Sequence, residues 1–125
     1  MAKILVVDDS RFMQVSLRSI IEKDGRHKVI GEAGDRETAI SKYKELKPDL
    51  VTMDIVMPFE SGLRAIKEIV RFDKDAKIIV ISSLGQENII EAATVIGAKG
   101  YIVKPVEAEK LLQAIDRVLG ERQAE

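Results

Sequence analysis

Two apolar runs in the chain end directly in carboxylates. Residues 4–7 are followed by Asp8 and Asp9, and residues 50–53 are followed by Asp54. An ionised carboxylate at the end of a buried strand is costly unless a cation, a hydrogen-bond donor or a reaction accounts for it. Three such groups in one place would repel one another, and a divalent cation is the simplest way to stabilise them. Oxygen ligation by a few carboxylates and water is typical of Mg²⁺ rather than of zinc or copper.

Two further apolar runs end in groups that suit a phosphoryl ligand. Residues 77–81 are followed by Ser82, and residues 101–103 are followed by Lys104 and Pro105. A lysine and a hydroxyl supply the positive charge and the donor that phosphoryl oxygens require. Each residue alone has an ordinary interpretation as a helix cap, a turn residue or a solvent-exposed lysine. Their combination at four strand ends favours a site for phosphoryl chemistry.

The elements that must position these groups alternate along the whole chain. Strands are expected at residues 4–7, 29–30, 50–54, 77–81 and 101–103. Helical spacing of apolar residues follows each strand, with Ser10 capping the first helix and Gly97 ending the fourth. This alternation predicts an α/β fold, a doubly wound (βα)5 parallel sheet with helices on both faces. Because parallel strands point the same way, the groups that follow them meet at the carboxyl edge, where ligands bind.

The composition limits the kinds of protein that this chain can be. Its 125 residues are enough for one domain with a real hydrophobic core. It has no cysteine, which excludes disulfides, a thiolate nucleophile and cysteine-ligated metals. The formal net charge of −1 gives no general attraction to nucleic acid or anionic lipid. No apolar run approaches the ~20 residues of a membrane span. We therefore expect a single cytoplasmic domain over residues 1–125, without nucleic-acid or membrane partners.

The residues at the strand ends resemble the receiver domain of two-component response regulators. The resemblance rests on Asp8 with Asp9, Asp54 with Met57, Pro58 and Gly62, Ser82, and Lys104 with Pro105. It covers essentially the whole chain and implies a flavodoxin-like, three-layer fold with strand order 2-1-3-4-5. It also implies a phosphorylation-activated signalling switch rather than an enzyme. Such a protein catalyses only its own phosphorylation and slow dephosphorylation.

The resemblance implies how the acidic residues would act. Asp54 would accept the phosphoryl group of a sensor histidine kinase as an aspartyl phosphate. Mg²⁺ would be bound by Asp9 and Asp54, by Asp8 partly through water, and by the backbone carbonyl of Val56. The side chain of Val56 departs from the family pattern, as does Leu84, because polar groups are common at both positions. Neither can hydrogen-bond an attacking water, so we hypothesise slow loss of the phosphoryl group.

The resemblance also implies the parts of a switch. Lys104 would pair with the phosphoryl oxygens, with a cis bond to Pro105. Ser82 would move to bond the new phosphoryl group, and Tyr101 would turn inward with it. His27, the only histidine, is interpreted as a solvent-exposed loop residue remote from this edge. The phosphodonor must then come from another protein.

Output is expected through protein–protein contact. The chain ends after the fifth helix, and the resemblance favours a stand-alone regulator of chemotaxis type. It would act on a downstream protein through the face formed by its fourth helix, fifth strand and fifth helix. The alternative is a receiver domain from a longer regulator with a transcriptional or enzymatic output.

Two other classes share parts of the pattern. Phosphatases of the haloacid dehalogenase type use an aspartate nucleophile but need a second acid two positions later, where this chain has Val56. Flavodoxin-type modules share the fold but need a glycine- and hydroxyl-rich phosphate loop after the first strand. Asp8 and Asp9 would repel a phosphate there in the absence of a metal. Both interpretations are therefore disfavoured.

Overall fold

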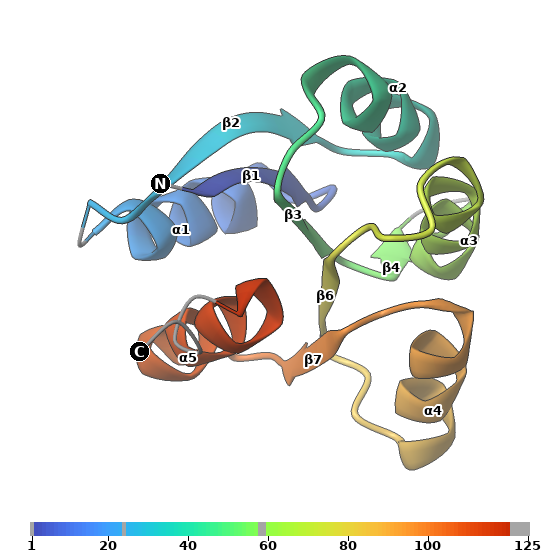
Figure 1. Ribbon diagram of the computed structural model, residues 1–125. Helices are drawn as coiled ribbons and strands as arrows, with labels where there is room; N and C mark the ends of the chain where they lie inside the picture. The colour runs from blue at the N-terminus through green and yellow to red at the C-terminus, as the bar shows by residue number, and fades with distance from the viewer. Residues whose placement is uncertain (1, 24, 58–59, 121–125) are drawn as a thin grey trace.

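The computed structural model describes residues 2–23, 25–57 and 60–120, in which strands and helices alternate (Figure 1). The strands are β1 (Ala2–Val7), β2 (His27–Ala33), β3 (Leu50–Met53), β4 (Val56–Met57), β5 (Glu60–Ser61), β6 (Ile78–Ser82) and β7 (Gly100–Val103). The helices are α1 (Arg11–Glu22), α2 (Arg36–Leu46), α3 (Gly62–Phe72), α4 (Glu87–Ile96) and α5 (Ala108–Leu119). No helix in the described ranges has the length and apolar character needed to cross a bilayer.

Five of the strands form one parallel sheet in the order β2-β1-β3-β6-β7. Counted along the chain, these five strands are arranged 2-1-3-4-5, so the predicted fold class and strand order are confirmed. Helices α1 and α5 cover one face of the sheet, and α2, α3 and α4 cover the other (Figure 1). The molecule therefore has three layers, with the sheet in the middle.

Alternate residues of the central strands face two separate hydrophobic layers. In β1, Leu5 and Val7 pack in the layer with α2, α3 and α4, whereas Ile4 and Val6 pack in the layer with α1 and α5. All four side chains are buried. Since successive strand residues point to opposite faces, a strand covered on both faces is apolar throughout. This explains the continuous apolar runs of the sequence.

The helices begin and end where local sequence provides caps. The hydroxyl of Ser10 accepts a hydrogen bond from the backbone N–H of Met13 at 3.2 Å, as expected of an N-cap. Gly97, with φ 130°, is the C-cap of α4 in a conformation that other residues rarely adopt. Lys47 ends α2 in the left-handed region, directly before Pro48. The cap at Ser10 keeps the end of β1 close to the start of α1, whereas Lys47 and Gly97 turn the chain from a helix toward the next strand.

Two parts of the fold differ from the expectation. The first is β2, which begins at His27 rather than Val29, and the side chain of His27 is buried. The interpretation of His27 as a solvent-exposed loop residue is therefore wrong. Its neighbours Arg26 and Lys28 are exposed, because side chains alternate between the two faces of a strand. The charged residues on both sides of His27 made the segment resemble an exposed loop, although the side chain of His27 itself points inward.

The second difference is in the connection from β3 to α3. No strand is expected between residue 54 and residue 77, but two short strands, β4 and β5, pair antiparallel there, with Val56 opposite Ser61. Pro58 and Phe59 lie outside the described residues. This two-stranded pairing folds the chain back so that α3 begins beside the end of β3.

Candidate functional site

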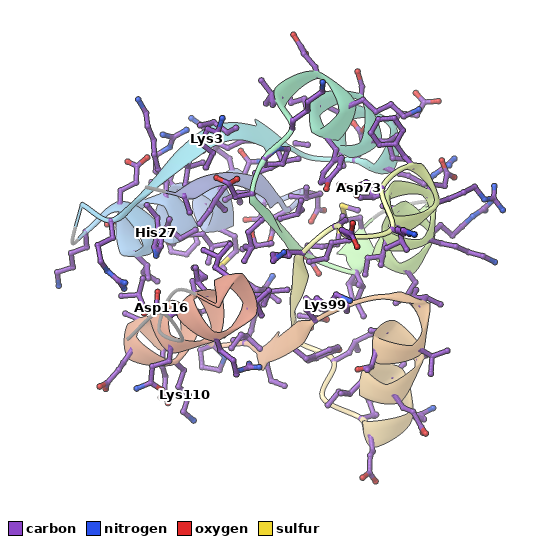
Figure 2. All side chains as sticks on the ribbon, viewed as in Figure 1. Lys3, His27, Asp73, Lys99, Lys110 and Asp116 are labelled. Carbon is purple, nitrogen blue, oxygen red and sulfur yellow. The ribbon has the colours of Figure 1, made fainter. Side chains whose placement is uncertain are left out.

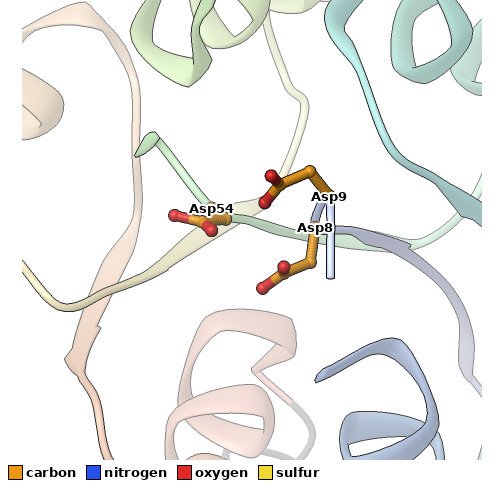
Figure 3. Close-up of side chains that lie close together, drawn as sticks. All are labelled: Asp8, Asp9 and Asp54. Carbon is orange, nitrogen blue, oxygen red and sulfur yellow. The ribbon is translucent and has the colours of Figure 1, made fainter. Parts of the chain in front are cut away.

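The acidic residues lie at the carboxyl ends of two adjacent strands. β1 and β3 pair in parallel with Val7 opposite Met53, so Asp8 and Asp54, which follow them, lie side by side. The backbone N–H of Asp54 also donates to the carbonyl of Val7 at 2.9 Å. One carboxylate oxygen from each of Asp8, Asp9 and Asp54 lies within 4.8 Å of the others (Figure 3). The structure thus brings together the three predicted acids.

Lys104 reaches these carboxylates from the end of β7. Its Nζ lies 3.1 Å from Oδ2 of Asp8 and 3.4 Å from Oδ2 of Asp54. Because β6 lies between β7 and β3, only a long side chain can span that distance. The peptide bond between Lys104 and Pro105 is cis, as the resemblance implied. One ammonium therefore bridges two carboxylates that come from different strands.

Burial dominates the electrostatics of Asp54. The residue is 5 % exposed, and burial raises the pKa of its carboxyl above the usual value. The N–H of Val56, which donates to Oδ1 at 2.9 Å, and the charge of Lys104 lower this pKa, but they do not reverse the rise. Burial alone would lower the pKa of Lys104, but its hydrogen bond to Asp8 and the neighbouring carboxylate charges raise it overall. The contacts of Asp54 with Val56 and Lys104 do not fully offset the cost of burying its negative charge, so an added cation would be favourable.

The donor set of this cluster fits Mg²⁺. All candidate donors are oxygens, which magnesium prefers, and the ion usually retains several waters. Asp9 is exposed, and within the described ranges its carboxylate has no hydrogen-bond partner. It is therefore open both to a metal and to that metal's waters. Asp8 is buried and restrained, with Oδ1 accepting from the N–H of Ser10 at 2.8 Å.

Two of the predicted switch residues, Ser82 and Tyr101, contact the backbone of Leu84. Ser82 is fully buried at the end of β6, and its Oγ accepts a hydrogen bond from the N–H of Leu84 at 3.1 Å. The hydroxyl of Tyr101 donates to the carbonyl of Leu84. Burial raises the pKa of Tyr101, and the charge of Asp54 acts in the same direction. Leu84 therefore links a buried hydroxyl near the acids to a tyrosine on the edge strand.

Gly62 permits α3 to begin close to the end of β3. A Cβ at this position would lie 2.4 Å from the carbonyl oxygen of Asp54 and 2.5 Å from Cα of Ile55. The N–H of Gly62 donates to the carbonyl of Ile55 at 3.1 Å, which holds the two segments together. A side chain here would displace backbone rather than a flexible group. Gly62 thus fixes the position of the segment that carries Asp54.

Gln14 is a residue near the acidic pair that no pattern in the sequence predicts. Its side chain is buried on α1, and Nε2 donates to the backbone carbonyl of Asp8 at 2.7 Å. Nothing in the sequence separates it from the other polar residues of this helix. Only its position, one turn after the Ser10 cap, places it near the acidic pair.

Comparisons with known proteins identify the family. Residues 4–116 match the family model described as the response regulator receiver domain. The chain is 48% identical over 116 residues to chemotaxis protein CheY of Thermotoga maritima, covering 93% of this chain and 96% of that protein. It is 47% identical over 120 residues to protein CcdB of Bacillus subtilis, covering 96% of this chain and 99% of that protein. The chain belongs to the response regulator receiver domain family.

A solved structure agrees with this assignment. The CheX–CheY–BeF3–Mg complex of Borrelia burgdorferi contains a chain with TM-score 0.90 and 39% identity, covering 94% of this chain and 88% of that chain. The family and the acidic cluster together make this chain a phosphorylation-activated signalling domain.

Proposed function

We propose that this protein is a stand-alone, cytoplasmic regulator of chemotaxis type that receives a phosphoryl group on Asp54 from a sensor histidine kinase. The observation that carries the proposal is the meeting of three carboxylates with one lysine at the carboxyl edge. The similarity to chemotaxis proteins of T. maritima and B. subtilis supports the pathway. A receiver domain from a longer regulator is less well supported, since the transcriptional regulator YdfI is only 34% identical.

The site supplies each part of a phosphoryl transfer. A carboxylate oxygen of Asp54 attacks the phosphorus of a phosphohistidine, the P–N bond breaks, and the imidazole leaves with its electron pair. Asp8, Asp9, Asp54 and the backbone carbonyl of Val56 would hold Mg²⁺, which when bound supplies positive charge to the phosphoryl oxygens. The ammonium of Lys104, already 3.4 Å from Asp54, is placed to bind one of those oxygens.

The switch would act through the backbone of Leu84. Once Asp54 is phosphorylated, the hydroxyl of Ser82 donates to the phosphoryl group and gives up its bond with the N–H of Leu84. Movement of Leu84 also alters the hydrogen bond that its carbonyl, in the next peptide unit, accepts from Tyr101, which then turns inward. The face of α4, β7 and α5, with the turn at Pro105, would change its affinity for a downstream protein.

The side chains beside the phosphoryl site favour a long-lived phosphoryl group. Val56 is 48% exposed next to Asp54, and Leu84 is partly buried, and neither can orient a water for attack. Replacing Val56 with Asn and Leu84 with Gln is expected to shorten the lifetime of the phosphorylated protein by about tenfold or more, because their amides can orient an attacking water; a true general base would contribute ~10²–10⁴-fold. An unchanged lifetime in the double variant would contradict this part of the proposal.

The test of the function is direct. The protein is incubated with acetyl phosphate and Mg²⁺, and mass spectrometry is used to find one added phosphoryl group that hydroxylamine removes. We expect the adduct in the wild type and in Asp75→Asn, which neutralises an exposed carboxylate at the other edge of the sheet. We expect none in Asp54→Asn or after addition of EDTA. An adduct of equal yield in Asp54→Asn would refute Asp54 as the acceptor.

A further inference from the structure

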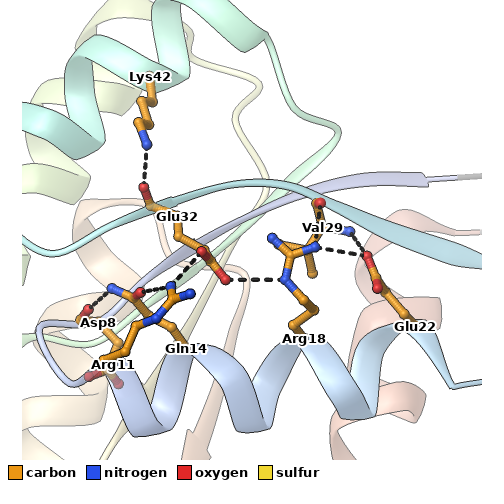
Figure 4. A network of polar contacts seen from close by, with 8 residues as sticks. All are labelled: Asp8, Arg11, Gln14, Arg18, Glu22, Val29, Glu32 and Lys42. Carbon is orange, nitrogen blue, oxygen red and sulfur yellow. Dashed lines mark hydrogen bonds and ion pairs between the residues drawn. The ribbon is translucent and has the colours of Figure 1, made fainter.

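We propose that Gln14 is a positioning residue for the turn that carries Asp8 and Asp9, and that Arg11 and Glu32 hold it in place. This inference rests on the proposed function, because its consequence is the affinity of the site for Mg²⁺. The residues form a chain of hydrogen bonds that runs from β2, across the start of α1, to the acidic pair (Figure 4).

The first contact is between Gln14 and the acidic turn. Nε2 of Gln14 donates to the carbonyl oxygen of Asp8 at 2.7 Å, and the side chain of Gln14 is buried. That carbonyl belongs to the peptide unit that joins Asp8 to Asp9. Restraining its orientation therefore restrains the direction of both neighbouring carboxylates. The N–H of Asp8 is held by the carbonyl of Ala33 at 2.9 Å, so Gln14 completes the support from the opposite side.

The second contact fixes the orientation of the Gln14 amide. An amide has one accepting and one donating end, and it positions a carbonyl only when the donating end faces it. Nη1 of Arg11 donates to Oε1 of Gln14 at 3.0 Å, which directs Nε2 of the same amide toward Asp8. The same nitrogen of Arg11 donates to Oε1 of Glu32 at 2.9 Å. Arg11 is therefore anchored to β2 while it orients Gln14.

The third part is a charged anchor on β2. Glu32 also accepts from Nε of Arg18 at 3.2 Å, and its backbone carbonyl accepts from Lys42 of α2 at 2.6 Å. Burial would raise the pKa of Glu32, but its hydrogen bonds to Arg11 and Arg18 lower it overall, so the anchor stays ionised. Side chains from both faces of the sheet thus hold the residue to which Arg11 is tied.

This support matters because Mg²⁺ is demanding in geometry. It requires a nearly ideal octahedron with short metal–oxygen distances, and a small rotation of one carboxylate weakens binding. Residues that orient metal ligands commonly change affinity by about 10- to 100-fold when they are replaced. The contribution of Lys104 and Asp54 to the chemical step does not pass through Gln14. Replacing Gln14 should therefore lower the affinity for Mg²⁺ without lowering the maximal rate of phosphorylation.

The test compares Gln14→Met with Ser19→Met. Both substitutions replace an uncharged polar residue of α1 by methionine, but Ser19 is exposed and takes no part in the contacts among Gln14, Arg11 and Glu32. Mg²⁺ is titrated into the unphosphorylated proteins by calorimetry, and phosphorylation by acetyl phosphate is followed as a function of Mg²⁺. Gln14→Met is expected to raise the dissociation constant for Mg²⁺ about tenfold. Its rate at saturating Mg²⁺ should stay within about twofold of the wild type, and Ser19→Met should bind Mg²⁺ like the wild type.

Three outcomes decide the matter. Unchanged Mg²⁺ affinity in Gln14→Met, or equal weakening in Ser19→Met, would show that the network only stabilises the fold. If Gln14→Met does not fold, Gln14→Asn takes its place, because asparagine keeps the amide and adds no charge beside the carboxylates but is one methylene too short to make the same contacts. A wild-type protein that neither binds Mg²⁺ nor takes up a phosphoryl group would overturn the proposed function itself.

Discussion

Two clusters around buried carboxylates lie at opposite ends of the sheet, and they differ in the balance of charge. At the carboxyl edge, Asp8 and Asp54 share one ammonium, that of Lys104, with Asp9 nearby. At the amino edge, Asp116 of α5 accepts from Arg26 at 3.0 Å, and its other oxygen lies 3.4 Å from Nε2 of His27. Figure 2 shows His27 and Asp116 close together where α5 passes the start of β2.

The difference separates a binding site from a structural contact. At the amino edge a single carboxylate is paired with the guanidinium of Arg26 and lies beside the imidazole of His27, so no added ion is needed. At the carboxyl edge three carboxylates face one cation, and two of those acids are buried. Burial of charge occurs in both places and does not by itself identify a functional site. What distinguishes the carboxyl edge is its excess of negative charge. Four substitutions test this comparison, in order of decreasing expected effect.

The largest effect is expected from Gly62→Ala, which disturbs the carboxyl edge without changing any charge. The added methyl would meet the backbone of Asp54 and Ile55 at 2.4–2.5 Å, so the strand end must move. We expect the free energy of unfolding to fall by about 3 kcal/mol, measured by urea denaturation. Gly85→Ala is the control, since its methyl would meet only side-chain atoms of Val103 at 3.4 Å. Equal losses in the two variants would contradict the argument.

The second-largest effect is a loss of stability that we expect from Asp116→Ala at the amino edge. The substitution leaves the buried imidazole of His27 and the guanidinium of Arg26 without their shared carboxylate. Removing one partner of a buried pair is destabilising, and partial exposure of Arg26 moderates the loss to about 2 kcal/mol. Asp116→Asn keeps an acceptor for Arg26 and should lose less. Urea denaturation distinguishes the two, and a stabilising effect of Asp116→Ala would remove the contrast between the clusters.

At the carboxyl edge, the corresponding change should have the opposite sign. Because burial raises the pKa of Asp54 in the folded state, the wild type loses stability as the pH rises from the unfolded-state value near 4 through the folded-state value. Asp54→Asn avoids this loss and should be more stable by on the order of 1 kcal/mol at pH 7 without metal. The gain should shrink toward pH 4.

Mg²⁺ provides the control for the predicted stabilisation by Asp54→Asn. Mg²⁺ should raise the melting temperature of the wild type more than that of Asp54→Asn, because only the wild type has the complete set of carboxylates. Thermal denaturation with Mg²⁺ or EDTA measures this difference. A metal-free Asp54→Asn protein that is less stable than the wild type at pH 7 would show that the carboxyl edge is already neutralised.

The smallest effect is expected from Glu32→Gln. The folded-state pKa of Glu32 is lowered, so its contribution is fully present above the unfolded-state value near 4.3 and is lost as the pH falls through the folded-state value. Its partners Arg11 and Arg18 are 73% and 41% exposed, so solvent screens the interaction. We expect a loss of roughly 0.5 kcal/mol at pH 7 that narrows with acid and with added salt. A loss that persists below pH 3 would point to packing instead.

Most of the site could be predicted because it depends on strand direction alone. Asp8, Asp54, Ser82 and Lys104 each follow an apolar strand, and parallel strands deliver their ends to one edge whatever the details of packing. The fold class followed from the same alternation. The sequence predicts only that Lys104 lies at the same edge as the acids. Its contact with both of them depends on the order of strands in the sheet, because its side chain must extend across β6.

The chain by itself determined the order of elements, the helix caps and the residues at the functional edge, because these depend on neighbours within a few positions. The tertiary structure decided which way individual polar side chains point. His27 is turned inward by the alternation of β2 and meets Asp116, which lies 89 positions later in the chain. Gln14 is directed at Asp8 by an arginine that is tied to Glu32. The contacts of His27 with Asp116 and of Arg11 with Glu32 join distant parts of the sequence, so no local pattern can specify them.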